Sequence, residues 1–196
     1  MKTKTVLLVA LTVVLLLAPR AVRSQPAVAL SNIGLKLDLG AGSERLAGAL
    51  NLEPAGALAL HLGYGVSQPV TLWLGLQVSK HVQEELPELQ SGMTGVELNL
   101  QYKLRPFQRF RPYGKVGLGG FILETEATQI TLTGGGVVWA LGVEYRLAKF
   151  LSLGGEFYWK DFDFDRRRLG HESDFEKLED PLPGDSRGFM LHLTLQ

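Results

Sequence analysis

Residues 96–104 read VELNLQYKL, a stretch in which every second residue is apolar and the residues between them are polar. This period of two is the period of a β-strand, because successive side chains of a strand point to opposite faces of a sheet. The same alternation recurs elsewhere, and it predicts strands over residues 33–39, 58–64, 70–78, 96–104, 116–122, 137–147, 151–159 and 189–195. The sequence therefore predicts an all-β protein of about eight strands.

The segments between the predicted strands alternate in length. The long ones span residues 40–56, 79–92, 124–136 and 161–187, and the short ones span residues 65–69, 105–112 and 148–150. Long loops on one rim and short turns on the other are typical of transmembrane β-barrels. We therefore expect an antiparallel up-and-down transmembrane β-barrel of about eight strands.

The N-terminal residues have the features of a secretory signal peptide. Lys2 and Lys4 give a positively charged start, and residues 6–17 are apolar with a single threonine among them. This apolar core is shorter than the about 20 residues that a membrane-spanning helix needs, which argues against an uncleaved anchor.

We expect the signal peptide to be cleaved after Ser24, which leaves Gln25 at the new N-terminus, while residues 27–29 offer a later site. The expected organisation is a signal peptide over residues 1–24 and one outer-membrane β-barrel domain over residues 25–196.

The composition excludes several classes of protein. Lys plus Arg number 20 and Asp plus Glu number 20, so the net charge is zero and no overall field attracts nucleic acid. The absence of cysteine excludes disulfides, thiolate metal sites and cysteine nucleophiles. After residue 25 no uncharged apolar stretch approaches the about 18 residues of a transmembrane helix, so helical membrane spans are not expected.

The aromatic residues indicate that the apolar phase faces lipid. Several of them fall at the ends of the predicted strands, as in the interfacial girdles of membrane barrels, whereas a soluble core would draw them toward the strand centres. Tyr64, Tyr102 and Tyr145 would form the periplasmic girdle, and Trp139, Trp159 and Phe189 the outer girdle. Trp73 is an exception, because it lies on the polar phase.

The polar phase would then line the lumen. Its charged residues are five basic and four acidic ones: Lys36, Asp38, Glu97, Lys103, Lys115, Glu144, Arg146, Glu156 and Lys160. Charges withdrawn from water must be paired or hydrated, and about eight strands enclose space only for side chains. We expect a lumen filled by a charge network, in which Lys115, Glu144, Arg146 and Glu156 lie close together.

Residues 27–196 resemble the small outer-membrane β-barrel family, which includes OmpA-like and OmpX-like transmembrane domains and opacity-type proteins. The most specific piece is residues 111–119, RPYGKVGLG, which is similar to a Pro-Tyr-x-x-x-Gly-x-Gly pattern at the start of a strand in that family. Residues 193–196, LTLQ, depart from the aromatic ending usual in the family. The resemblance implies an outer-membrane location, contact with outer-membrane lipid and lipopolysaccharide, and assembly by the barrel assembly machinery.

One pattern has the spacing of a calcium-binding loop. Asp161, Asp163, Asp165 and Glu172 occupy positions 1, 3, 5 and 12 of an EF-hand-like segment, but Arg166 stands where the sharp turn needs glycine. We expect a solvated charged loop here and no metal site.

A second pattern concerns hydrolysis. His192 and Thr194 project to the same side of the last predicted strand, but no signal supplies a nucleophile, a base and an orienting carboxylate together. We expect His192 to form hydrogen bonds in the lumen, and we expect no catalytic site and no cofactor.

These observations favour a structural or interaction protein of the outer membrane, with charged extracellular loops, a lumen filled by side chains and no catalysis. The alternatives are a soluble secreted β-barrel that binds a small hydrophobic ligand, a small-solute channel, and a lipid-modifying outer-membrane enzyme. A soluble barrel would carry the apolar phase inside, and an ion channel would favour one sign of charge in its lumen.

Overall fold

The computed structural model describes residues 32–48, 52–82, 90–125, 127–170 and 174–196. These residues form eight strands: β1 (Gly34–Gly48), β2 (Ala55–Gly65), β3 (Val70–Val82), β4 (Gln90–Lys103), β5 (Phe110–Thr125), β6 (Ile130–Ala148), β7 (Leu151–Leu169) and β8 (Glu176–Leu195). The predicted signal peptide, residues 1–24, lies outside the described residues. Within the described part of the chain, no helix has the length and apolar character to cross a membrane.

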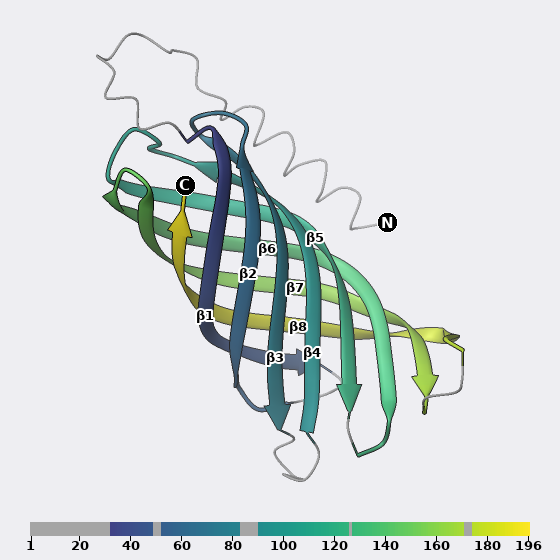
Figure 1. The fold of residues 1–196 in the computed structure, drawn as a ribbon. Coiled ribbons are helices and arrows are strands. Elements are labelled where there is room, and N and C mark those ends of the chain that lie inside the picture. Colours follow the sequence, from purple (N-terminus) through teal and green to yellow (C-terminus); the bar gives the residue numbers. More distant parts are fainter. Residues whose placement is uncertain (1–31, 49–51, 83–89, 126, 171–173) are drawn as a thin grey trace.

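The strands close into a barrel. Each strand pairs antiparallel with the next one in sequence, and β8 returns to pair antiparallel with β1 (Figure 1). The closing register places Leu37 opposite Leu195 and Gly48 opposite Gly184. The predicted fold, an eight-stranded antiparallel up-and-down barrel, is confirmed, and closure leaves no open sheet edge.

The apolar phase of the strands faces outward. In β2, Leu58, Leu60 and Leu62 are exposed, whereas Ala59 and His61 between them are buried. The same alternation along the other strands leaves many large apolar side chains on the outer wall, far more than a water-exposed surface carries. Lipid is the environment in which such a wall is stable.

Short turns join the strands at one end of the barrel, which we call the turn end. They span residues 66–69, 104–109 and 149–150. These positions match the short connectors predicted from the sequence to within a few residues. The start of β1 and the end of β8 lie at the same end, since Leu37 pairs with Leu195.

At the opposite end, the rim end, the strands are longer than the sequence predicted. The segments 124–136 and 161–187 were expected to be loops, yet β6 begins at Ile130, β7 continues to Leu169 and β8 begins at Glu176. The expected loops were too long because the alternation of polar and apolar residues continues into them. At the rim end it is reversed, so that the inward side chains are apolar and the outward ones polar.

The polarity change is clearest at the rim end of β7. Phe162 and Phe164 point into the barrel and are buried, while Asp161 and Asp163 point outward and are exposed. The first two carboxylates of the calcium-like pattern therefore lie on the outer face of a strand and not in a loop. Glu172, the last residue of that pattern, lies outside the described residues.

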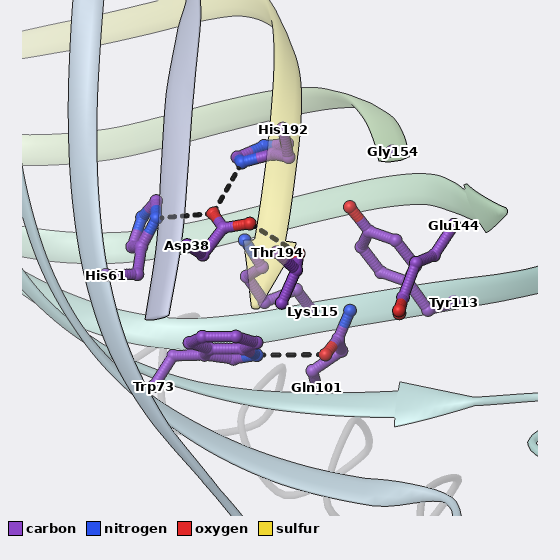
Figure 2. Close-up of a pocket in the computed structure, with 10 residues that line it drawn as sticks. All are labelled: Asp38, His61, Trp73, Gln101, Tyr113, Lys115, Glu144, Gly154, His192 and Thr194. Atoms are coloured by element: carbon purple, nitrogen blue, oxygen red, sulfur yellow. Dashed lines mark hydrogen bonds and ion pairs between the residues drawn. The ribbon is translucent and has the colours of Figure 1, made fainter. Parts of the chain in front are cut away.

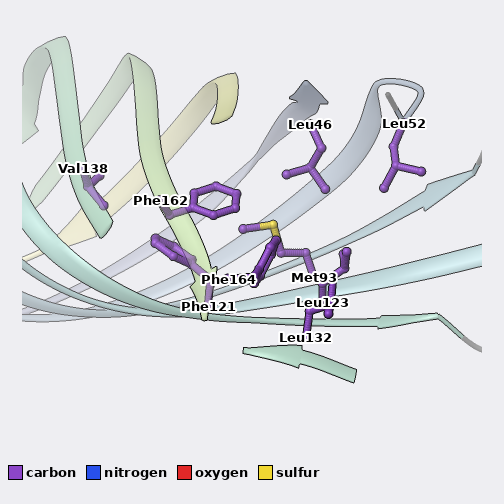
Figure 3. Packing of buried hydrophobic residues seen from close by; sticks show 9 residues of the cluster. All are labelled: Leu46, Leu52, Met93, Phe121, Leu123, Leu132, Val138, Phe162 and Phe164. Carbon is purple, nitrogen blue, oxygen red and sulfur yellow. The ribbon is translucent and has the colours of Figure 1, made fainter. Parts of the chain in front are cut away.

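The barrel interior consequently has two zones. A cluster of buried apolar side chains, which we call the apolar cap, fills the rim end (Figure 3). It consists of Leu46, Leu52, Met93, Phe121, Leu123, Leu132, Val138, Phe162 and Phe164. Between the cap and the turn end, the interior is filled mainly by polar and charged side chains.

Candidate functional site

The predicted lumen charges all lie on the inner face of the barrel. Eight of them have at most 5% of their surface exposed: Lys36, Asp38, Glu97, Lys103, Glu144, Arg146, Glu156 and Lys160. The ninth, Lys115, has a side chain that is 7% exposed. They occupy three levels between the turn end and the apolar cap, and we describe these as the base, middle and upper layers.

The base layer is organised around Glu144 on β6. The Nζ atom of Lys103 lies 2.7 Å from Glu144 Oε2, and the Nη2 atom of Arg111 donates to Glu144 Oε1. Arg111 Nη2 also donates to Ser152 Oγ at 2.8 Å. Lys36, at the same level, donates to the side chain of Gln196 at 2.6 Å. One carboxylate thus holds two cations from neighbouring strands.

The middle layer joins two carboxylates, Asp38 and Glu156, and Figure 2 shows the first of them with its hydrogen-bond partners. Asp38 on β1 accepts a hydrogen bond from Thr194 and lies against the imidazoles of His61 and His192. Glu156 on β7 is 2.8 Å from Lys115 Nζ.

Two further groups connect Glu156 to its surroundings. It accepts a 2.9 Å hydrogen bond from Tyr113, and its Oε1 atom lies 3.2 Å from His192 Nε2. His192 therefore bridges the two carboxylates of this layer.

The upper layer is centred on Lys160, whose side chain is 2% exposed. Its Nζ atom lies 2.9 Å from Glu97 Oε1 and 3.2 Å from Glu44 Oε1. Glu44 also accepts hydrogen bonds from Ser79 and Ser186. The Lys160 ammonium group lies under the apolar cap, 5.5 Å from the centroid of the Phe121 ring.

The predicted network of four residues is arranged differently from the expectation. Lys115 on β5 pairs with Glu156 on β7, past the intervening β6, but Glu144 pairs with Lys103 and Arg111. Arg146 is buried in the same base layer as Glu144.

Sequence reasoning missed two charged lumen residues, Glu44 and Arg111, because it assigned both to connectors. Their phase could have identified them. Glu44 continues the inward series of Lys36 and Asp38, and Arg111 shares the parity of Lys115. Among the described residues the buried charges then number six basic and five acidic ones, which keeps the near balance that was predicted.

Trp73, the aromatic residue on the polar phase, points into the lumen and is 5% exposed. Its indole Nε1 donates a 2.9 Å hydrogen bond to Gln101 Oε1, so the polar atom of the ring is satisfied. The ring lies over Gly63 on β2, where an added Cβ would stand 2.4 Å from it. A glycine on the neighbouring strand therefore makes room for this side chain.

The predicted girdle residues lie on the outer face. Tyr64, Tyr102 and Tyr145 are near the turn end, whereas Trp139, Trp159 and Phe189 lie within the long strands β6 to β8 rather than at their ends. The second group is not terminal because these strands continue past it, beyond the lipid-facing band, with polar outer side chains.

The comparisons with known proteins agree with this geometry. Residues 8–176 match the sequence model of the outer membrane protein beta-barrel domain. The fold is similar to the crystal structure of Neisserial surface protein A, with a TM-score of 0.60 and 12% identity over 83% of this chain and 96% of that chain. No curated protein sequence matches the chain.

Two further crystal structures have the same fold. OprG from Pseudomonas aeruginosa aligns with a TM-score of 0.56 and 12% identity, over 83% of this chain and 95% of that chain. Ail, the attachment invasion locus protein of Yersinia pestis, aligns with a TM-score of 0.52 and 11% identity, over 83% of this chain and 98% of that chain. The chain belongs to the outer membrane protein beta-barrel domain family, and it is an outer-membrane protein.

Proposed function

We propose that this protein is a structural and interaction barrel of the outer membrane, sealed by its own side chains, whose rim end contacts lipopolysaccharide. It neither conducts solutes nor catalyses a reaction. The observation that carries this proposal is the filling of the lumen by ion pairs between strands two or three places apart around the barrel, closed at the rim end by the apolar cap.

The three charged layers and the cap act as seals in series. An ion that crossed the barrel would have to separate buried pairs such as Lys115–Glu156 and Lys160–Glu97, and would then have to pass the cap without water. Breaking a buried pair exposes an uncompensated charge to a low-dielectric interior, which is strongly unfavourable. Eight-stranded barrels also enclose space only for side chains.

Recording from the folded protein in planar lipid bilayers tests the seal. The unmodified barrel is expected to give no steady conductance. The variant F121A/F162A, which shrinks the cap and leaves the charged layers in place, should stay silent if the ion pairs also seal the lumen. Steady single-channel steps from the unmodified protein would instead support the channel alternative.

A pair of arginines supports contact with lipopolysaccharide. Arg45 on β1 lies opposite Arg187 on β8, and both are exposed on the outer face. The preceding outward-facing pair of these strands is Ser43 and Phe189, at the end of the lipid-facing band. The two arginines are the next outward-facing pair toward the rim end. Arg187 lies 3.5 Å from Asp185, but this pair is exposed and contributes little stability. Like charges directly opposite one another destabilise a sheet, so an anion that bridges the two arginines would be stabilising. Lipopolysaccharide phosphates provide such anions at this level.

The binding of a saccharide polyanion by a related fold agrees with this proposal. Ail from Yersinia pestis was crystallised in complex with sucrose octasulfate, a heparin analogue. For the present protein, added lipopolysaccharide should raise the thermal unfolding temperature, and R45A/R187A should reduce that rise. The control K177A removes an exposed lysine farther from the lipid band and should keep the rise. An unchanged response in the arginine variant would refute this contact.

The proposal that the protein is not an enzyme is supported by the hydrogen bond of Thr194 in the middle layer. Thr194 donates its hydroxyl hydrogen to Asp38 Oδ1 at 2.6 Å, so the hydroxyl faces a carboxylate and not an imidazole base. The middle layer therefore lacks the hydroxyl–imidazole contact that activates a serine or threonine nucleophile. In the upper layer Ser79 Oγ lies 2.9 Å from His81 Nε2, but Ser79 donates its hydrogen to Glu44 and is buried. Incubation with labelled phospholipid or lipopolysaccharide should give no turnover, and release of acyl chains would restore the lipid-modifying alternative.

We also propose that residues 1–24 are a signal peptide that is removed on export, after which the barrel assembly machinery inserts the domain over residues 25–196. N-terminal sequencing of protein from the outer-membrane fraction tests the first step. The expected first residue is Gln25, and an intact Met1 would contradict it.

A further inference from the structure

We propose that Asp38, His61 and His192 bind one divalent transition-metal ion inside the barrel. The three residues come from the consecutive strands β1 and β2 and from β8, which lies beside β1 only because it closes the barrel (Figure 2). Each residue offers one ligand atom, and these atoms all lie within 4.8 Å of one another. The proposal concerns a binding site in the sealed lumen and does not depend on what the rim contacts.

The donor atoms converge on one oxygen. His192 Nδ1 lies 2.7 Å and His61 Nδ1 3.1 Å from Asp38 Oδ2. The other carboxylate oxygen, Oδ1, accepts the hydrogen bond from Thr194, which fixes the carboxylate and leaves Oδ2 directed at the two imidazoles. Tetrahedral ligands around Zn²⁺, with bonds of about 2.0–2.1 Å, stand about 3.3 Å apart. Both nitrogen atoms are closer to Oδ2 than this, so each imidazole would have to move away from Oδ2 by a few tenths of an ångström to admit the ion.

The second nitrogen of His192 has the partner that a metal-bound imidazole usually has. If Nδ1 binds the metal, Nε2 carries the hydrogen, and it faces Glu156 Oε1 at 3.2 Å. A carboxylate behind a ligand histidine orients the ring and raises its basicity. Glu156 is itself held by Lys115 and Tyr113, so the outer partner is fixed in turn.

Small residues on the neighbouring strands allow both rings to take these positions. A Cβ added at Gly75, opposite His61, would stand 2.3 Å from the imidazole Cδ2. A Cβ added at Gly40, opposite His192, would stand 3.1 Å from Nδ1. These glycines make the convergence of the two imidazoles possible at mid-lumen.

The surroundings suit a single small cation. The three residues line a cavity of about 20 Å³ together with Thr194, which is room for about one water-sized occupant. The middle layer contains two carboxylates, Asp38 and Glu156, against one lysine, so its fixed charge is negative. Two imidazole nitrogens and one carboxylate oxygen favour Zn²⁺, Co²⁺, Ni²⁺ or Cu²⁺ over Ca²⁺ and Mg²⁺, which prefer all-oxygen sets. A water molecule would take the fourth position.

The test refolds the full chain in detergent from chelator-treated, unfolded protein with Zn²⁺ present at increasing concentrations, because the filled lumen leaves no open path to the site once the barrel has folded. The folded protein should retain one equivalent of Zn²⁺, and refolding with Co²⁺ should give the visible absorption of a tetrahedral complex. His61→Gln and His192→Gln should each weaken Zn²⁺ binding at least tenfold. The matched control is His81→Gln, since His81 is a buried lumen histidine in the upper part that hydrogen-bonds to Ser79 and not to Asp38.

Heat-modifiable gel mobility must show that each variant is folded. If His61→Gln does not fold, the Co²⁺ spectrum of the unmodified protein decides, because nitrogen and oxygen ligation at a tetrahedral site differs from the octahedral aqua ion. Absence of a one-equivalent Zn²⁺ transition, or an equal loss of affinity in His81→Gln, would overturn the proposal. Steady conductance in the bilayer recording would refute the sealed barrel and would leave one-equivalent Zn²⁺ binding unaffected, so the two proposals fail separately.

Discussion

Trp139 and Trp159 lie opposite each other on the outer face of the β6–β7 pair, and the next outward pair toward the rim is Val137 opposite Asp161. The inner face changes at the same level, where Lys160 is followed by the buried Phe162. Below this level the wall is apolar outside and polar inside. Above it the wall is polar outside and apolar inside, as in a barrel surrounded by water. We therefore propose that the two tryptophans mark the outer edge of the bilayer.

Tryptophan fluorescence in vesicles tests this assignment of the bilayer edge. In variants that keep a single tryptophan, with the other two replaced by phenylalanine, brominated lipids should quench Trp139 and Trp159. Trp73 should not be quenched, because its ring lies inside the barrel against Gln101. Strong quenching of Trp73, or none of the other two, would contradict the orientation of the two faces.

Leu74 and Leu98 are exposed cross-strand partners in the lipid-facing band of β3 and β4. Leu74→Arg and Leu98→Arg should each destabilise the barrel in vesicles, lowering its free energy of unfolding by about 2–4 kcal/mol, as charge near a bilayer midplane does. The control is Asp163→Arg on β7, an exposed outward position beyond the bilayer edge. It should cost less than about 1 kcal/mol. Denaturant titrations measure these differences. Equal losses of stability at the three sites would show that the position assigned to the bilayer is wrong.

Glu144 holds both Lys103 and Arg111 in the base layer. Glu144→Gln keeps the shape of the side chain but leaves two buried cations without their carboxylate, which should cost about 3–5 kcal/mol of folding free energy. Glu176→Gln is the control, since Glu176 is 72% exposed and meets Arg167 at 3.7 Å on the surface. It should change stability by no more than about 0.5 kcal/mol. If both variants unfold at the same denaturant concentration, the base layer is hydrated and the ion pairs do not fill it.

The sequence predicted the strand order, the short turns and the inward phase because one physical pattern, the alternation of side chains, determines all three. It failed at the rim end for a specific reason. The alternation was interpreted as a strand only while the apolar residues stayed at the same alternate positions. From Asp161 and Phe162 onward the apolar residues occupy the other set of positions, and this change was interpreted as the start of a loop. The glycines from Gly134 to Gly136 were taken for a connector, yet an added Cβ at Gly134 would meet the Asp163 carbonyl oxygen at 1.9 Å. They are strand residues where two strands approach closely.

The histidine site in the middle layer could not be predicted in the same way. The sequence placed Asp38 and His192 on the polar phase, and His61 falls on it by the alternation over residues 58–64. Their meeting depends on the stagger between β8 and β1, which sets Asp38 opposite Thr194. Alternation determines the face of a residue and not its height in the barrel. Register is fixed by closure of the whole sheet, and a single strand carries no signal for it.

The most direct test of the sealed barrel uses the absence of native cysteine. Ser186 is fully buried beside Glu44 in the upper layer, and Thr128 is exposed at the rim end. In vesicles, a membrane-impermeant charged thiol reagent should modify Thr128→Cys rapidly and Ser186→Cys only after unfolding. If Ser186→Cys reacts in the folded barrel at a rate close to that of Thr128→Cys, the lumen is filled with water and the protein is not sealed.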